Sequence, residues 1–109
     1  MAWLLRDGEV LASLEIADTR ASRRRGLLGR DSLDGALLLV PARGVHTLGM
    51  RFPIDVAWLD ADLVVLRTAR LRRGRMSRPV LRARQVLEAE AGSFARWELQ
   101  VGQQLERQD

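Results

Sequence analysis

The feature that most constrains the fold is a six-residue run, Ile54 to Leu59, that directly follows Pro53 and is apolar except for Asp55. Proline cannot donate a hydrogen bond to a neighbouring strand, so a strand has to begin at or after Pro53. A strand with apolar residues on both of its faces is covered on both sides. The run therefore predicts a central strand of a β-sheet, entered through a loop and a sharp turn over residues 45–53.

Asp55 lies near the start of this buried strand and needs partners, because a buried carboxylate without them is very costly. Arg51, Thr47 or His46, all in the preceding loop, could each provide one. Two interpretations remain open. In the first, Asp55 accepts backbone N–H groups or an arginine and fixes the start of the strand. In the second, it has a chemical role, since carboxylates with specific partners also occur at functional sites.

Short strands are expected along most of the remaining chain. Asp7-Gly8 predicts a tight hairpin turn between residues 3–6 and 10–16. Further strands are expected at 36–40, 45–48, 63–71 and 85–91, with residues 106–109 frayed. Six to eight short strands with one or two short helices indicate a mostly β protein. We expect a small single-domain β-sandwich or barrel-like fold over residues 1–109, with its core at about 9–105.

Two short helices are expected. The first begins at Asp18 or Thr19, either of which can cap a helix, and turns Ala21 and Leu28 inward. The second follows Gly92, with Ser93 as its cap.

Composition excludes several kinds of site. The chain of 109 residues has no cysteine and one histidine, so it offers neither disulfides nor thiolate or multi-histidine metal sites. We expect no metal and no cofactor. No apolar run approaches the roughly 20 residues that span a bilayer. Asp7 and Gly8 come too early for a signal peptide, so we expect a cytoplasmic protein with no membrane partner.

All 18 basic residues are arginine, and eight of them lie between Arg67 and Arg84, within a stretch that has no acidic residue from Leu63 to Leu87. Arg72, Arg73 and Arg75 are the anion-binding candidates of this segment. The segment has no aromatic side chain to stack on bases. A solvated, arginine-rich sheet edge that resists aggregation is therefore favoured over nucleic-acid binding.

Several spaced motifs point to one family. Ala17-Asp18-Thr19 is followed by Arg23-Arg24-Arg25-Gly26-Leu27-Leu28-Gly29-Arg30, by the run from Val45 to Trp58, and by Val86-Leu87-Glu88-Ala89-Glu90-Ala91-Gly92. With these motifs the chain resembles the bacterial and archaeal proteins called domain of unknown function 192, over nearly its whole length. The resemblance implies a small, mostly β sandwich. It implies no catalytic residue, because none is established for the family.

Three functions remain open. The first is binding of a small molecule or a protein partner in a pocket formed by His46, Thr47, Met50, Arg51, Asp55 and Glu88, which combine apolar walls with a few polar groups. The second is nucleic-acid binding through the Arg67–Arg84 segment. The third is a hydrolase in which His46 acts as general base and Asp55 orients it. No serine stands in a nucleophile motif and no cysteine exists, so a binding or accessory domain is favoured over an enzyme.

Overall fold

The structure is a computed structural model that describes residues 1–109. It is mostly β, as expected, with seven strands and two short helices. Their bounds are β1 (Ala2–Arg6), β2 (Glu9–Ala17), α1 (Arg20–Arg25), β3 (Ala36–Leu39), β4 (Ile54–Leu59), β5 (Val65–Leu71), β6 (Gln85–Glu90), α2 (Ser93–Arg96) and β7 (Glu106–Gln108).

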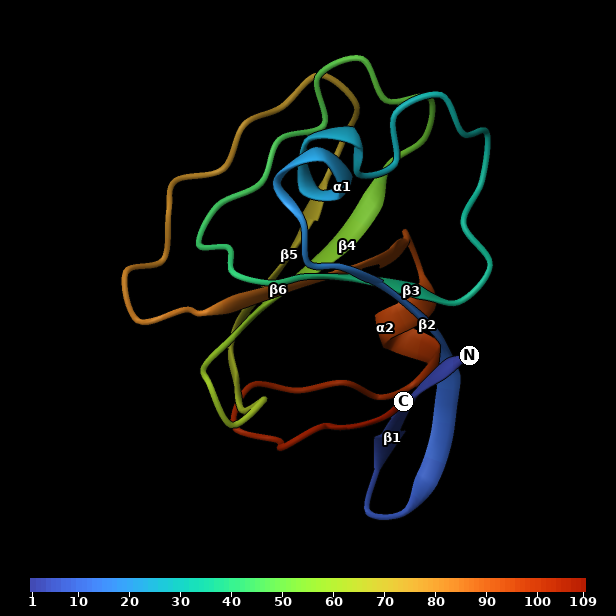
Figure 1. The fold of residues 1–109 in the computed structure, drawn as a ribbon, viewed down its shortest axis with the longest axis vertical. Helices are drawn as coiled ribbons and strands as arrows, with labels where there is room; N and C mark the ends of the chain where they lie inside the picture. The colour runs from blue at the N-terminus through green and yellow to red at the C-terminus, as the bar shows by residue number, and fades with distance from the viewer.

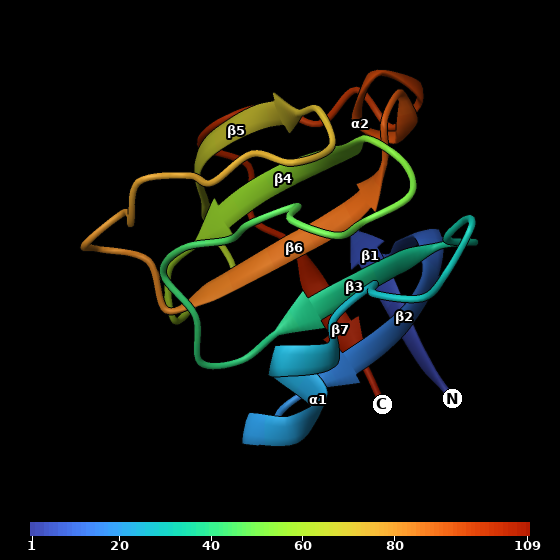
Figure 2. The same cartoon turned by 90° about the horizontal axis from the view of Figure 1, so that it is seen from above.

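All seven strands belong to one sheet, in the order β5-β4-β6-β3-β2-β1-β7. Every neighbouring pair is antiparallel except β2 and β3, which are parallel. A parallel pair needs a crossover connection, and residues 18–35, which contain α1, provide it (Figure 2). The predicted central strand is confirmed: β4 lies between β5 and β6, and all six of its residues are buried.

The sheet is not closed into a barrel. Its edge strands β5 and β7 approach each other through an isolated bridge between Val64 and Gln104, which lie just outside them. The expectation that residues 106–109 are frayed is wrong for most of this segment, because Glu106–Gln108 pair with β1 as strand β7. This pairing attaches the end of the chain to the N-terminal hairpin.

The two faces of the sheet carry separate apolar clusters. The α2-side core contains Leu4, Leu14, Ala36, Leu38, Ala57, Leu59, Val65, Leu87, Ala89, Phe94, Leu99 and Leu105. The α1-side core contains Ala17, Leu27, Leu33, Leu37, Leu39, Met50, Phe52, Ile54, Val56, Trp58, Ala83 and Val86. In Figure 1, α1 and the long loops lie above the sheet, and α2 with the C-terminal segment lies below it.

Local sequence explains the two connections at the start of the chain. Asp7 (φ 53°) and Gly8 (φ 79°) both have the positive φ that the predicted hairpin turn requires. Thr19 caps α1 in a reciprocal arrangement with Ser22, in which each side-chain oxygen accepts a hydrogen bond of 3.0 Å from the other residue's backbone N–H. Gly26 follows the helix with φ 47°.

The predicted orientation of the first helix was wrong. Ala21 and Leu28 are exposed, and α1 buries none of its residues. The helix ends at Arg25, so the inward side chain is Leu27, in the turn that follows it. The second helix starts one residue earlier than expected, because Gly92 is its N-cap, with no side-chain cap, and Ser93 is its first residue.

Residues 45–48 do not form the expected strand. One bridge, between His46 and Met76, is the only ladder contact there. Buried Thr47 takes the place of a ladder, and its backbone N–H donates a hydrogen bond to the Arg75 carbonyl (2.7 Å). The Thr47 hydroxyl donates to the Arg72 carbonyl (2.5 Å) and accepts from the Arg75 N–H (2.8 Å). Thr47 therefore joins the loop before β4 to the loop after β5.

Asp55 anchors α2 to the sheet. One carboxyl oxygen accepts hydrogen bonds from the N–H groups of Gly92 (2.9 Å) and Phe94 (3.1 Å) at the start of the helix. The other oxygen accepts from Arg70 Nε (3.0 Å), directly opposite on β5. The structural interpretation of Asp55 is thus confirmed, but its partners are not the loop residues expected. Asp55 has the same direction in β4 as Ala57 and Leu59, toward α2 and away from that loop.

Asp55→Asn is expected to lower the free energy of unfolding by about 1–3 kcal/mol, because an amide N–H₂ group would then face an N–H donor of α2 or of Arg70. Urea unfolding measures the change. Asp31→Asn is the control: Asp31 forms an exposed ion pair with Arg51 (2.9 Å), and such pairs contribute about 0–1 kcal/mol. Equal effects of the two substitutions would contradict the anchoring role.

Candidate functional site

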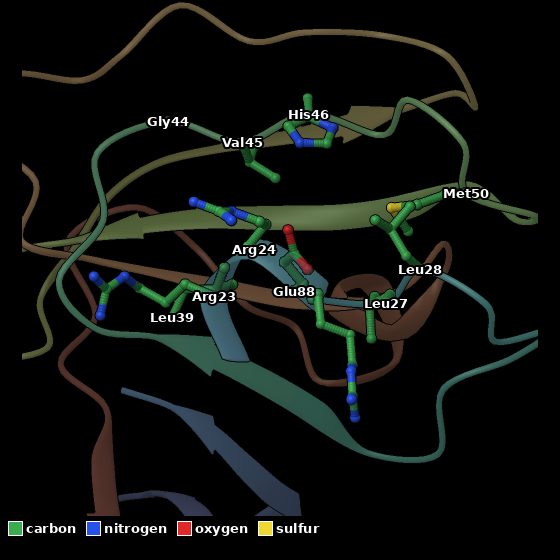
Figure 3. Close-up of a pocket in the computed structure, with 12 residues that line it drawn as sticks. Arg23, Arg24, Leu27, Leu28, Leu39, Gly44, Val45, His46, Met50 and Glu88 are labelled. Carbon is green, nitrogen blue, oxygen red and sulfur yellow. The ribbon is translucent and has the colours of Figure 1, made fainter. Parts of the chain in front are cut away.

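A small cavity of about 90 Å³ lies on the α1-side face of the sheet. It is enclosed by the end of α1 and the turn after it, by the loop before β4, and by the middle of β6 (Figure 3). The lining residues are Arg23, Arg24, Arg25, Gly26, Leu27, Leu28, Leu39, Gly44, Val45, His46, Met50 and Glu88. Most of its wall is apolar, and its polar groups are an acid, three arginines and a histidine.

Glu88 forms the floor of the cavity. Its register neighbours are Leu37 on β3 and Val56 on β4, both in the α1-side core, so the alternation of β6 directs Glu88 to this face. Only 3% of the residue is exposed. Figure 3 shows its carboxyl group pointing into the space beneath Val45 and His46.

The Glu88 carboxyl has no partner within the protein. It forms no salt bridge or hydrogen bond, and burial alone raises its pKa from 4.5 to about 7. No fully buried side-chain oxygen of the protein lacks a partner, so the carboxyl oxygens of Glu88 must reach the open space of the cavity. A carboxyl with this pKa is divided between its protonated and charged forms at neutral pH, and can donate or accept a hydrogen bond.

Three arginines line the cavity because α1 ends there. Arg23 is held by a hydrogen bond of 3.1 Å from its guanidinium to the Val40 carbonyl. Arg24 and Arg25 are exposed and lie in the last turn of α1, where positive charge favours the helix dipole. None of these arginines is within ion-pair distance of Glu88. The cavity therefore has unpaired groups of both charge signs.

The structure brings together three of the six residues that the sequence assigned to a pocket. His46, Met50 and Glu88 line the cavity. Thr47 is buried against the Arg72 and Arg75 backbone, and exposed Arg51 pairs with Asp31. Asp55 belongs to the opposite face of the sheet, as described above.

Sequence reasoning did not assign the residues at the end of α1 to the site. The stretch from Arg23 to Leu28 supplies half of the cavity lining. A signal was present, because Arg-x-x-Gly-Leu was one of the motifs that carried the family resemblance. A run of three arginines on a short helix is typical of a solvated face, and nothing in the local pattern places that helix over β6.

The anion-binding candidates Arg72, Arg73 and Arg75 are exposed and lie outside the cavity lining. They belong to the loop that Thr47 holds. Two other arginines of the same segment have structural contacts: Arg70 pairs with Asp55, and the Arg67 guanidinium lies 5.7 Å from the centre of the Trp58 ring.

The geometry removes the basis of the hydrolase hypothesis. His46 lines the cavity on the α1-side face, whereas Asp55 is bonded to α2 on the other face, so Asp55 does not orient His46. No group of three or more histidine, cysteine or acidic residues is arranged to hold a metal ion. None of the helices has the length and apolar character needed to cross a membrane.

A single open sheet, a helical crossover and a small cavity over its central strands define a compact, mostly β domain. The chain belongs to the DUF192 family, which is described as "Uncharacterized ACR". The family model matches residues 2–107. The family resemblance seen in the motifs is thus confirmed. No curated protein matches the sequence.

Two solved structures share the fold. A protein of unknown function from Novosphingobium aromaticivorans has a TM-score of 0.79 and 20% identity, with 96% of this chain and 82% of that chain covered. A Sinorhizobium meliloti protein described as a "putative transcription regulator" has a TM-score of 0.79 and 22% identity, with 97% of this chain and 91% of that chain covered. At these identities the likeness shows a common fold.

Glu88→Gln is expected to stabilise the protein at high pH. The folded-state pKa of Glu88, about 7, lies above its ordinary value of 4.5, so the folded protein holds this proton more tightly than the unfolded chain. The resulting stability is present below pH 4.5 and is lost as the pH rises to about 7. The variant does not lose this stability. Its free energy of unfolding, relative to that of wild type, should therefore increase by up to about 3 kcal/mol between pH 5 and 8.

Urea unfolding of both proteins at several pH values measures this difference, in which the contributions of the other groups cancel. Glu98→Gln, at an exposed position, is the matched control and should show no such growth. If the free energies of unfolding of Glu88→Gln and wild type change with pH in parallel, the Glu88 carboxyl is not held in a desolvated site.

Proposed function

We propose that the protein is a binding domain, rather than an enzyme, and that its ligand occupies the cavity at Glu88. The observation that carries this proposal is the carboxyl group of Glu88, a residue that is 97% buried: this group has no partner in the protein and faces an open cavity. Leaving such a group unpaired is costly for folding alone, and a ligand with a complementary group would compensate for that cost.

The size of the cavity limits what enters it. A cavity of 150 Å³ holds a molecule as large as benzene, and this one is about 90 Å³. A group of a few non-hydrogen atoms would fit. Leu27, Leu39 and Met50 would contact its apolar part, and Glu88 would accept a hydrogen bond from a hydroxyl, amide or amine.

The positive groups at the mouth restrict the ligand further. Arg24, Arg25 and His46 are exposed there and favour an acceptor or an anionic group next to the donor that meets Glu88. The ligand would therefore combine a small hydrogen-bond donor with an acidic or carbonyl group, in a small molecule or on a protein partner.

A thermal-shift screen of metabolites, nucleotides and short peptides tests the proposal. A ligand at one hundred times its dissociation constant stabilises the protein by about 2.7 kcal/mol, which is a shift of several degrees. That shift should decrease in Glu88→Gln, which keeps one acceptor oxygen but loses the negative charge, and it should also decrease in His46→Ala. His46 is exposed, so His46→Ala alone should leave the melting temperature nearly unchanged.

Asp31→Asn is the control for this screen, because it removes an exposed carboxylate outside the cavity. Ligand shifts should be retained in it. A ligand that stabilises wild type and Glu88→Gln equally would bind elsewhere and would refute the cavity as the binding site.

Nucleic-acid binding through the Arg67–Arg84 segment is the second candidate. Arg72, Arg73 and Arg75 are exposed and form no salt bridge, and a structural neighbour is described as a "putative transcription regulator". Binding through phosphates would give an affinity that falls with salt, with a log–log slope of about −0.7 to −0.9 for each phosphate neutralised.

Fluorescence anisotropy with a labelled oligonucleotide measures that slope in wild type and in a variant with alanine at the three arginine positions. The slope should become less negative by about 2–3 in the variant. Weak binding that is equal in both proteins would refute this candidate, since the arginines would then make no phosphate contact.

A further inference from the structure

The cavity opens beside three exposed apolar side chains, Leu28, Leu48 and Met76, which we call the apolar rim. They are 38%, 46% and 70% exposed. Leu28 lines the cavity, and a Cβ atom placed on Gly49 would lie 3.3 Å from it, so Leu28 adjoins the loop that carries Leu48. Met76 forms the bridge with His46. Three neighbouring apolar groups at one mouth suggest a surface that is covered by a partner.

The charge around this rim is mostly positive, although Arg30 and Arg51 form ion pairs with Glu15 and Asp31. The segments 20–30, 41–53 and 63–87 hold fifteen of the eighteen arginines and none of the fourteen acidic residues. Segments 20–30 and 41–53 line the cavity, and hydrogen bonds of Thr47 connect segment 41–53 to segment 63–87. Long-range attraction at this face therefore selects an acidic partner.

The cavity and rim together favour a protein segment over other acidic partners. Pockets that hold whole small molecules are usually about 300–1,000 Å³, so this cavity takes one side-chain-sized group while the rest of the ligand lies outside it. The exposed apolar groups outside are Leu and Met side chains, and no aromatic residue lies in the loop 72–84 to stack on a base. Glu88 at the cavity floor would repel a phosphate.

We propose that the apolar rim and the arginines beside it dock an acidic, apolar segment of a partner protein, with one hydrogen-bond-donating side chain or chain end inserted at Glu88. The inserted group occupies the same cavity, so this inference rests on the proposed function. It adds that the ligand is part of a polypeptide and that most of its contact area lies outside the cavity.

Selection of random dodecapeptides displayed on phage against the immobilised full-length protein tests the docking. The enriched peptides should combine Asp or Glu with Leu, Ile, Met or Phe. A synthetic copy of an enriched peptide should bind the double variant Leu28→Ser and Met76→Ser about tenfold or more weakly than it binds wild type. The reason is that a few side chains buried by the bound peptide carry most of the binding energy. Glu88→Gln should weaken the same peptide, and Arg24→Glu with Arg25→Glu should also weaken it and reduce its salt dependence.

Val101→Ser is the matched control: Val101 is 61% exposed and lies in the turn before β7. Its affinity for the peptide should equal that of wild type. Enriched peptides without acidic residues, peptides that bind the rim variant as tightly as wild type, or no enrichment would each overturn the docking surface. An oligonucleotide that displaces the bound peptide, and that itself fails to bind the rim variant, would assign the face to nucleic acid instead.

The two proposals fail separately. Peptides that need Leu28 and Met76 but bind Glu88→Gln normally would retain the docking surface and remove the cavity from it. A small molecule whose thermal shift needs Glu88, with no selected peptide, would retain the cavity and overturn the polypeptide ligand.

Discussion

A carboxyl group on a strand that is covered on both faces needs partners, because a buried charge without them is costly. β4 and β6 are such strands, and each carries one buried acid. On one face Asp55 has three hydrogen-bond donors and joins a helix to the sheet. On the other face Glu88 has none and borders a cavity. The two residues are chemically alike but have different surroundings. Asp55 therefore stabilises the fold, whereas Glu88 is a candidate ligand-binding group.

The cavity depends on loops that the sheet itself does not determine. Its walls come from the crossover after β2 and from the loop before β4, and buried side chains such as Leu27 and Met50 attach them to the α1-side core. The reciprocal cap between Thr19 and Ser22 fixes the start of α1. The Thr47 hydroxyl fixes the other wall by bonding to the backbone of the arginine-rich loop. Substitutions at either position would displace a cavity wall without entering the cavity.

The sheet was largely predictable from sequence, because its signals are local. Pro53 and the apolar run after it located β4, and Asp7-Gly8 located the first hairpin. The candidate site was less predictable, because its parts are brought together by topology. Nothing in the sequence shows that β6 pairs with β3 and β4, and this pairing is what places Glu88 beneath α1. A separation of nine residues allows His46 and Asp55 to meet if the intervening turn folds back, but strand alternation directs Asp55 to the opposite face.

The single parallel strand pair has a consequence for motion. An antiparallel hairpin can be closed by two residues, whereas β2 and β3 are connected by the long segment 18–35 that crosses over the sheet (Figure 2). Because α1 buries none of its own residues, this crossover has few apolar contacts to hold it, and Leu27 and Leu33 supply most of them. Local opening of this crossover would leave the ladder hydrogen bonds of β4 and β6 intact, so their amides should stay protected from hydrogen exchange until the whole domain unfolds. Part of the cavity wall thus belongs to a connection that contributes no strand to the sheet.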